Sequence, residues 1–257
     1  MLGTLRETLK GRALMAYLTA GDPYVDWETI NILSEGGVDI FEFGIPMAKP
    51  KYDGLTIKAS YKRALEGGAT LEKSFNIIKE FKLSHKIVFT YFEYAESVGL
   101  EKFVDYSKNA GAEGVLFPDL LIDYPEELDT YIRYCNKYGF SPIFFVTSSF
   151  PHNLISRLAQ LDPAFIYLGV MASTGTLLPI SISRNIRIVK NLIADTPLFV
   201  GFAISEPLQV MDCVRAGASG VVVGSAIIRL ISQKKVKTVI REDLKNYVVS
   251  LKSALKV

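Results

Sequence analysis

Eight short apolar segments recur along this chain, and they alternate with longer segments in which apolar residues have helical spacing. The expected strands are residues 14–19, 40–45, 87–92, 115–118, 143–147, 165–170, 198–202 and 221–223. Most are continuously apolar, which is typical of parallel strands buried on both faces of a sheet. Helices are expected near residues 24–35, 70–82, 98–110, 124–138, 152–161, 181–194, 206–216 and 237–254. Eight strand–helix repeats favour an α/β barrel.

The chain has 257 residues, a length that suits one barrel domain. No Pro- or Ser-rich linker divides it, so we expect residues 1–257 to form a single domain. The segments GGVDIFEFG, GAEGVLFPD and GASGVVVGS resemble one another, as repeats of one unit would. An open doubly wound sheet would show the same alternation, but no GxGxxG motif follows the first expected strand.

Charge and cysteine content exclude several classes of function. The chain has 29 Lys and Arg residues against 27 Asp and Glu residues, a net charge of +2. We therefore expect no binding to nucleic acid or to an anionic membrane. Cys135 and Cys213 form no CxxC pair, and with two histidines they cannot build a typical zinc site. No stretch of 18 apolar residues and no apolar signal segment occurs, so we expect a cytoplasmic protein.

Two carboxylates are candidates for catalysis, because active sites of α/β barrels lie at the C-terminal ends of the strands. In the strand at 40–45, alternation places Glu42 opposite Phe41 and Phe43, so we expect Glu42 to point into the barrel mouth. Burial there would raise its pKa and suit it to proton transfer. The alternative is a structural carboxylate paired with an arginine or bound by backbone donors. Asp53, in the following loop, could be a second acid or a simple Asp-Gly turn.

Two turns rich in small residues are candidates for anion binding. Gly224 and Ser225 lead from the last expected strand into a helix, and Gly201 ends the preceding strand. Barrels of this kind bind phosphate at these two turns, so we expect a phosphate here, held by backbone donors without an arginine clamp. The alternative is that glycine only permits close packing. Asp22 and Asp119 are interpreted as turn or cap residues, and His85 and His152 receive no catalytic role.

Several motifs resemble the tryptophan synthase alpha subunit family along essentially the whole chain. They are AYLTAGDP, FEFGIP followed by YDG, VLFPDL, STG, GFAIS and RAGASGVVVGSAI. The resemblance implies a (β/α)8 TIM barrel that cleaves indole-3-glycerol phosphate into indole and glyceraldehyde 3-phosphate. It assigns catalysis to Glu42 and Asp53, with Tyr167 in support. It assigns substrate contacts to Thr174, Gly175, Gly201, Gly224 and Ser225 around the phosphate and to Tyr17, Ile57, Tyr91, Leu116 and Phe202 around the indole ring.

The resemblance also implies a partner, a beta subunit that carries pyridoxal phosphate, whereas the alpha subunit has no cofactor of its own. The family usually reads PFSDPxADGP where this chain reads PMAKPKYDGL, so Lys49 replaces an acidic residue in a loop that faces the partner. We therefore expect a weak or transient association with a standard beta subunit. Met171 and Ala203 also depart from the pattern, near the expected phosphate site.

Two other functions remain open at this point. One is another phosphate-binding barrel enzyme, such as an isomerase or a prenyl-glyceryl transferase, which would not require both Glu42 and Asp53. The other is a barrel that acts chiefly as an allosteric partner of a beta-type subunit.

Overall fold

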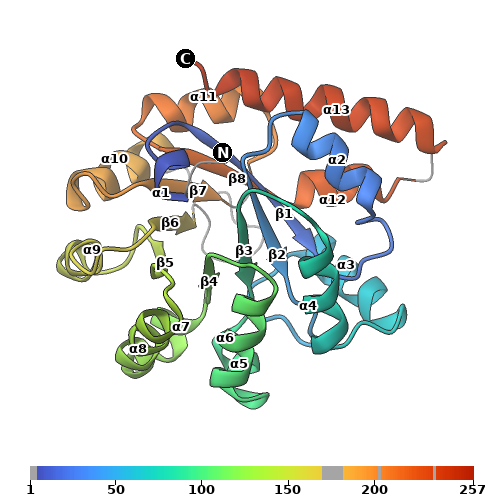
Figure 1. The fold of residues 1–257 in the computed structure, drawn as a ribbon. Helices are drawn as coiled ribbons and strands as arrows, with labels where there is room; N and C mark the ends of the chain where they lie inside the picture. The colour runs from blue at the N-terminus through green and yellow to red at the C-terminus, as the bar shows by residue number, and fades with distance from the viewer. Residues whose placement is uncertain (1–4, 170–181, 202–203, 234–235) are drawn as a thin grey trace.

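Eight parallel strands form one sheet in the computed structural model, which describes residues 5–169, 182–201, 204–233 and 236–257. Helices surround the sheet (Figure 1), and the expected (β/α)8 barrel is confirmed. The strands are β1 (Ala13–Thr19), β2 (Ile40–Gly44), β3 (Lys86–Phe89), β4 (Gly114–Leu116), β5 (Ile143–Thr147), β6 (Phe165–Gly169), β7 (Leu198–Gly201) and β8 (Gly220–Val223).

The largest difference from the expected strands is at β3, which ends at Phe89 instead of residue 92. The Asp119 carboxylate accepts hydrogen bonds from the backbone N–H groups of Phe92, at 2.6 Å, and Glu93, at 3.2 Å. These bonds satisfy donors in the first turn of a helix, so the chain leaves the strand there. Asp119 is therefore a cap residue, as the sequence predicts.

The helices enclose the barrel and include short ones that the sequence analysis did not list. They are α1 (Leu5–Thr8), α2 (Trp27–Glu35), α3 (Leu55–Glu66), α4 (Leu71–Glu80), α5 (Phe92–Ser97), α6 (Leu100–Asn109), α7 (Leu120–Asp123), the 3-10 helix η1 (Pro125–Glu127), α8 (Leu128–Tyr138), α9 (His152–Ala159), α10 (Ile182–Leu192), α11 (Pro207–Arg215), α12 (Ser225–Ile231) and α13 (Lys237–Ala254). Within the described ranges, no helix is long and apolar enough to cross a membrane.

The sheet runs in the order β4-β3-β2-β1-β8-β7-β6-β5, so β4 and β5 are its two edges. Tyr131 of α8 bridges these edges. Its hydroxyl accepts a hydrogen bond from Ile143 N at 2.9 Å and donates one to Val115 O at 2.8 Å. A buried side chain thus satisfies backbone groups that a strand pair would otherwise satisfy. The barrel is closed at this seam by a tyrosine.

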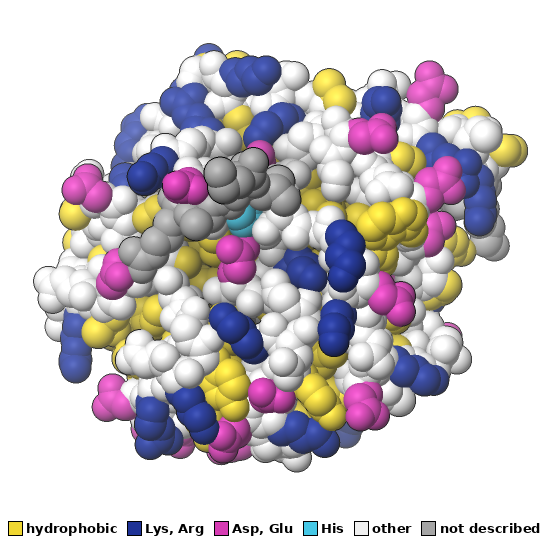
Figure 2. All heavy atoms as spheres, in the orientation of Figure 1, with side chains coloured by type: hydrophobic (Ala, Val, Ile, Leu, Met, Phe, Trp, Pro, Cys, Tyr) yellow, Lys and Arg dark blue, Asp and Glu magenta, His cyan; other side chains and the backbone are white. Residues whose placement is uncertain are grey.

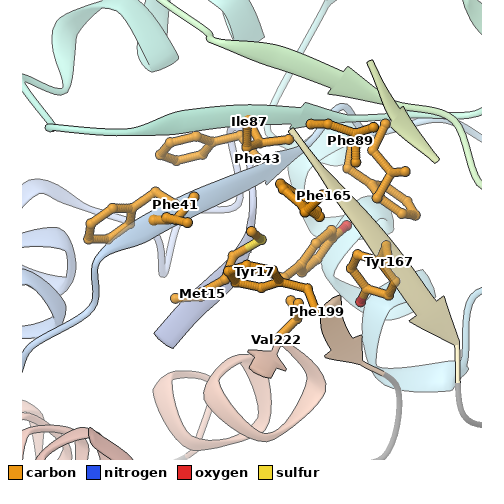
Figure 3. Packing of buried hydrophobic residues seen from close by; sticks show 14 of the residues in the cluster. Met15, Tyr17, Phe41, Phe43, Ile87, Phe89, Phe165, Tyr167, Phe199 and Val222 are labelled. Carbon is orange, nitrogen blue, oxygen red and sulfur yellow. The ribbon is translucent and has the colours of Figure 1, made fainter. Parts of the chain in front are cut away.

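Side chains alternate between the interior of the barrel and the helices. Figure 3 shows Met15, Tyr17, Phe165, Tyr167 and Phe199 gathered among the strands, and the rings of Phe165 and Phe199 lie 4.7 Å apart. The other face of β2 packs outward, because Phe43 stacks on Phe81, next to α4, with ring centroids 5.8 Å apart. This places Glu42, on the opposite face of β2, toward the interior, as the alternation predicts.

The N-terminal end of the barrel is covered by α1, whose Leu5 is buried. His85, immediately before β3, is buried there, with Nδ1 2.8 Å from Glu113 Oε2 and Nε2 2.8 Å from Thr8 Oγ1. These contacts hold α1 against the strands at the end opposite to the C-terminal strand ends. On the face of the molecule shown in Figure 2, Lys and Arg side chains are interspersed with Asp and Glu side chains.

Candidate functional site

A cavity of about 850 Å³ lies at the C-terminal end of the barrel. This volume is in the range of sites that enclose small organic molecules. Seven residues that the sequence analysis selected line it: Tyr17, Glu42, Asp53, Ile57, Tyr167, Gly224 and Ser225. The rest of its wall consists of Tyr52, Gly54, Leu55, Thr56, Phe89, Pro118, Ile122, Phe145, Thr147, Ser149, Phe150, Ile204, Ser205, Val222 and Arg229. The wall combines aromatic rings with a few polar groups.

Glu42 lies in the middle of β2, opposite Tyr17 of β1 and Ile87 of β3, and only 1% of its surface is exposed. Its Oε1 atom has no hydrogen-bond partner among the residues that the structure describes. Burial, together with the nearby charge of Asp53, raises the pKa of Glu42 to about 8. The alternative of an arginine-paired or backbone-bound carboxylate would require a partner for this oxygen. A buried, protonated carboxyl that faces a cavity is instead suited to proton transfer.

Asp53 lies in the loop between β2 and α3, and 6% of its surface is exposed. Its Oδ2 accepts a hydrogen bond from the Tyr91 hydroxyl at 2.8 Å. Burial raises the pKa of Asp53 to about 6, although the Tyr91 bond and the charge of Lys58 oppose that rise. Near neutral pH, Asp53 is thus mostly ionised and Glu42 mostly protonated. The two carboxyl groups offer one negative charge and one proton to a molecule in the cavity.

Two tyrosines press on glycines beside these carboxyl groups. The Tyr17 hydroxyl donates to the Tyr61 hydroxyl at 3.0 Å, and a Cβ on Gly44 would lie 2.0 Å from the Tyr17 hydroxyl. A Cβ on Gly201 would lie 1.9 Å from the Tyr167 hydroxyl. Burial raises the pKa of Tyr167 well above its ordinary value, and the charges of Glu42 and Asp53 add to this effect. Tyr167 therefore stays protonated beside both carboxyl groups.

Packing also explains the glycine at 224, because a Cβ there would lie 2.9 Å from the Tyr17 Cβ. The glycines at 201 and 224 are thus required by the tyrosines even without an anion, which is the alternative that the sequence left open. Ser225, which begins α12, and Gly224 nevertheless line the cavity, so their backbone and hydroxyl groups border the same space as Glu42.

Three predicted contact residues lie behind the cavity wall instead of in it. Tyr91 is buried, and its hydroxyl is occupied by Asp53 and by the backbone N–H of Tyr52. Leu116, at the end of the edge strand β4, is fully buried in the core. Gly201 faces the Tyr167 hydroxyl. Five further positions lie outside the described residues: Thr174, Gly175 and Phe202 among the predicted contacts, and Met171 and Ala203 among the departures.

The sequence analysis missed Arg229, which lines the cavity although no arginine was expected near the phosphate turns. Arg229 lies four residues after Ser225 on α12, which places the two side chains on one face of the helix. The four-residue spacing between Ser225 and Arg229 in an expected helix is the sequence signal that could have identified Arg229. Phe89 and Phe145, from β3 and β5, were also missed. In the fold, the Phe89 ring packs edge-on against Tyr17 and the Phe145 ring packs against Tyr167, each with centroids 5.6 Å apart, and these partners are far away along the chain.

Other reactive groups in the described part of the chain are structural. Asp22 is buried and accepts hydrogen bonds from Arg63, at 2.5 Å, and from the backbone of Tyr24, at 3.1 Å. Cys135 and Cys213 are buried, and burial raises the pKa of each thiol to about 12, so neither is a nucleophile at neutral pH. Among these residues, no group of three or more His, Cys, Asp or Glu side chains is placed to hold a metal ion.

Comparisons with known proteins find relatives that match nearly the whole chain. A family model described as tryptophan synthase alpha chain matches residues 5–256. A relative from Saccharolobus solfataricus named tryptophan synthase alpha chain is 34% identical over 233 residues, which cover 90% of this chain and 93% of that protein. Another with the same name, from Methanoregula boonei, is 32% identical and covers 99% of both chains.

A solved structure of a mutant tryptophan synthase alpha-subunit from Pyrococcus furiosus has the same fold. Its TM-score is 0.80 at 29% sequence identity, and the match covers 94% of this chain and 98% of that one.

Proposed function

Since this chain belongs to the tryptophan synthase alpha chain family, we propose that its cavity cleaves indole-3-glycerol phosphate into indole and glyceraldehyde 3-phosphate. The activity is that of a carbon–carbon lyase in tryptophan biosynthesis. One observation carries the assignment of the chemistry to this cavity. Within the described part of the chain, the buried Glu42 carboxyl has an oxygen without a hydrogen-bond partner, and this carboxyl borders the same cavity as Asp53.

The reaction is a retro-aldol cleavage that requires one proton to be given and one to be taken. Glu42 donates a proton to C3 of the indole ring, which leaves a positive charge centred on N1. The hydroxyl of the side chain then loses its proton, the carbon–carbon bond to C3 breaks, and its electron pair returns to the ring. The products are indole and an aldehyde. Glu42 recovers its proton from the hydroxyl, so it ends the reaction in the state in which it began.

Asp53 stabilises the charge that develops during this reaction. Its carboxylate accepts a hydrogen bond from the indole N1–H, and that bond strengthens as N1 becomes positive. An interaction that is stronger in the transition state than in the ground state raises the rate of the chemical step. We assign Tyr167 a supporting role, because it is buried and protonated close to both carboxyl groups.

The remaining wall suggests how the substrate is oriented. The indole ring packs against Tyr17, Ile57 and Phe89, whose apolar surfaces border the cavity together with Glu42. The phosphate binds at the backbone of Gly224 and Ser225, where Arg229 adds a positive charge from the same helix. The distance between the residues that contact the indole ring and the turn that binds the phosphate determines where the scissile bond lies beside Glu42.

We further propose that the chain uses no cofactor of its own and that it lies in the cytoplasm. It passes indole to a beta subunit that carries pyridoxal phosphate, and the association with that partner is transient. We also treat residues 1–257 as one barrel domain.

The decisive experiment measures indole release from indole-3-glycerol phosphate by the isolated chain and by the chain with a beta subunit. Glu42→Gln should lower turnover by about 10² to 10⁴, the contribution of a positioned acid or base. Asp53→Asn should lower kcat more than it raises KM, because its contact matters most in the transition state. Turnover that is unchanged in Glu42→Gln would remove Glu42 from the mechanism. A barrel retained only as an allosteric partner would release no indole in either condition.

A further inference from the structure

The loop that carries Asp53 has little backbone structure of its own. It begins where Ile45 N donates to Phe89 O and ends where Gly54 O accepts from Lys58 N, each at 3.0 Å. Between these two bonds, residues 46–53 form no backbone–backbone hydrogen bond with any part of the chain that the structure describes. Two of the loop residues, Pro46 and Pro50, lack an N–H group. Side-chain contacts must therefore fix the position of Asp53.

The inner side of the loop is attached to Tyr91. Its hydroxyl accepts a hydrogen bond from Tyr52 N and donates one to Asp53 Oδ2, each at 2.8 Å. The rings of Tyr52 and Tyr91 stack with centroids 6.0 Å apart. The Tyr91 hydroxyl thus binds both the Tyr52 backbone and the Asp53 carboxylate. It can bind both only while Tyr52 keeps its position.

The outer side of the loop is attached to Asp123, the last residue of α7. Asp123 Oδ2 accepts hydrogen bonds from the Tyr52 hydroxyl at 2.7 Å and from Lys51 Nζ at 2.9 Å. Burial opposes ionisation of this carboxyl, yet the two bonds hold the pKa of Asp123 below its ordinary range. Asp123 therefore remains a charged acceptor near neutral pH. Hydrogen bonds to a charged group are stronger than those between neutral groups.

We propose that Asp123 is a positioning residue, which latches Tyr52 and Lys51 to α7 and so holds the catalytic loop with Asp53 facing the cavity. This inference rests on the proposed function, in which Asp53 must lie against the indole N1–H. Asp123 itself is not among the described residues that line the cavity, so it can act on the reaction only through the loop. It acts by increasing the fraction of molecules in which the loop is competent for catalysis.

The expected effect of losing Asp123 depends on the two hydrogen bonds that its Oδ2 accepts, from Lys51 and from Tyr52. The Lys51 ion pair is about half exposed, with 47% of the lysine side chain accessible, so it contributes little by itself. The Tyr52 bond is less exposed and also fixes the ring that stacks on Tyr91. We therefore expect loss of Asp123 to lower the competent fraction by about 10- to 150-fold, the range for one hydrogen bond to a charged group.

The first test compares steady-state kinetics of Asp123→Ala, Asp123→Asn and Glu93→Gln with those of the original chain. Asp123→Ala should lower kcat by the factor above and change KM little, and Asp123→Asn, which keeps an acceptor, should recover part of the loss. Glu93→Gln is the matched control, because Glu93 lies 4.0 Å from Lys51 and has no bond to Tyr52. An unchanged kcat in Asp123→Ala, or an equal loss in Glu93→Gln, would refute the positioning role.

The second test does not depend on activity. Hydrogen exchange of the Tyr52 amide, which donates to the Tyr91 hydroxyl, should be faster in Asp123→Ala and in Tyr52→Phe than in the original chain. Thermal unfolding shows whether each variant is folded. If Asp123→Ala does not fold, Tyr52→Phe alone is compared with the original chain. Unchanged exchange would overturn the latch. If the original chain releases no indole, the proposed function fails, whereas exchange in this loop still decides whether the latch exists.

Discussion

Glu42 and Asp53 occupy one cavity, but their surroundings separate their protonation states. Asp53 accepts a hydrogen bond from Tyr91 and is stabilised by the positive charge of Lys58. Glu42 Oε1 has no hydrogen-bond partner in the described ranges and lies near the negative charge of Asp53. The same burial therefore leaves one carboxyl ionised and the other protonated near neutral pH. Divergent pKa values of two neighbouring carboxyl groups are typical of a site with one acid and one charge stabiliser.

This separation predicts a bell-shaped dependence of kcat/KM on pH. Activity should rise as Asp53 ionises at about pH 6 and fall as Glu42 loses its proton at about pH 8. Because the substrate phosphate also titrates near pH 6, Asp53→Asn is the control, and it should abolish the acidic limb that Asp53 causes. Activity that continues to rise above pH 9 would show that Glu42 acts first as a base.

The raised pKa of Glu42 also predicts how the free energy of unfolding depends on pH. The pKa rises from an ordinary value of 4.5 to about 8, so the folded state binds more protons than the unfolded state between these values. Stability therefore falls as pH rises through this window. Glu42→Gln should match the original chain near pH 5 and exceed its free energy of unfolding by a few kcal/mol near pH 9.

Denaturant titrations at both pH values measure this difference. Glu96→Gln, which removes an exposed carboxylate, should change stability little at either pH. An equal effect of Glu42→Gln at pH 5 and pH 9 would show that Glu42 is not buried as an acid in the folded chain.

Among the elements, the junction of β4 and β5 is held by a side chain from a helix. Tyr131→Phe should leave Ile143 N–H and Val115 C=O without their bridging hydroxyl, at a loss of about 1–3 kcal/mol of stability. Tyr134→Phe, on the same helix, is the matched control and should have little effect. Urea titration measures both. Equal stabilities of the two variants would show that the tyrosine fills space without closing the barrel.

At the scale of the whole molecule, we expect charge near the catalytic loop to influence the choice of partner. A surface groove of about 550 Å³ is lined by Lys49, Lys58 and Lys62, together with Met47, Ala48, Pro50, Leu65 and Glu66. A beta subunit with a basic surface would meet like charge there, and one with an acidic surface would be attracted. The groove supports the expectation of weak association with a standard beta subunit.

Lys49→Asp should strengthen binding to a basic beta-subunit surface and weaken binding to an acidic one, each by several-fold. The effect should shrink at high salt, because exposed charges are screened beyond about 10 Å at 0.1 M. Lys10→Asp, which changes an exposed lysine at the opposite end of the barrel, should alter neither affinity. Titration calorimetry measures the affinity of the original chain and of both variants for each partner, and equal affinities before and after the Lys49 change would show that the loop does not select the partner.

The sequence by itself determined the strands of the barrel and the direction in which Glu42 points. Apolar runs and helical spacing are local properties, so all eight strands could be predicted, and alternation within β2 was enough to direct Glu42 inward. The motifs around Glu42 and Asp53 also identified the family. These features depend on residues close together in the chain.

Only the tertiary structure decided which distant residues share the cavity and what state they adopt. Arg229, Phe89 and Phe145 reach it because the barrel closes, and Tyr91 leaves its wall because Asp53 and Tyr52 use its hydroxyl. The bond between Tyr52 and Asp123 joins residues 71 positions apart. Burial, hydrogen bonding and charge proximity depend on all neighbours in space, and a periodic pattern along one chain does not contain them.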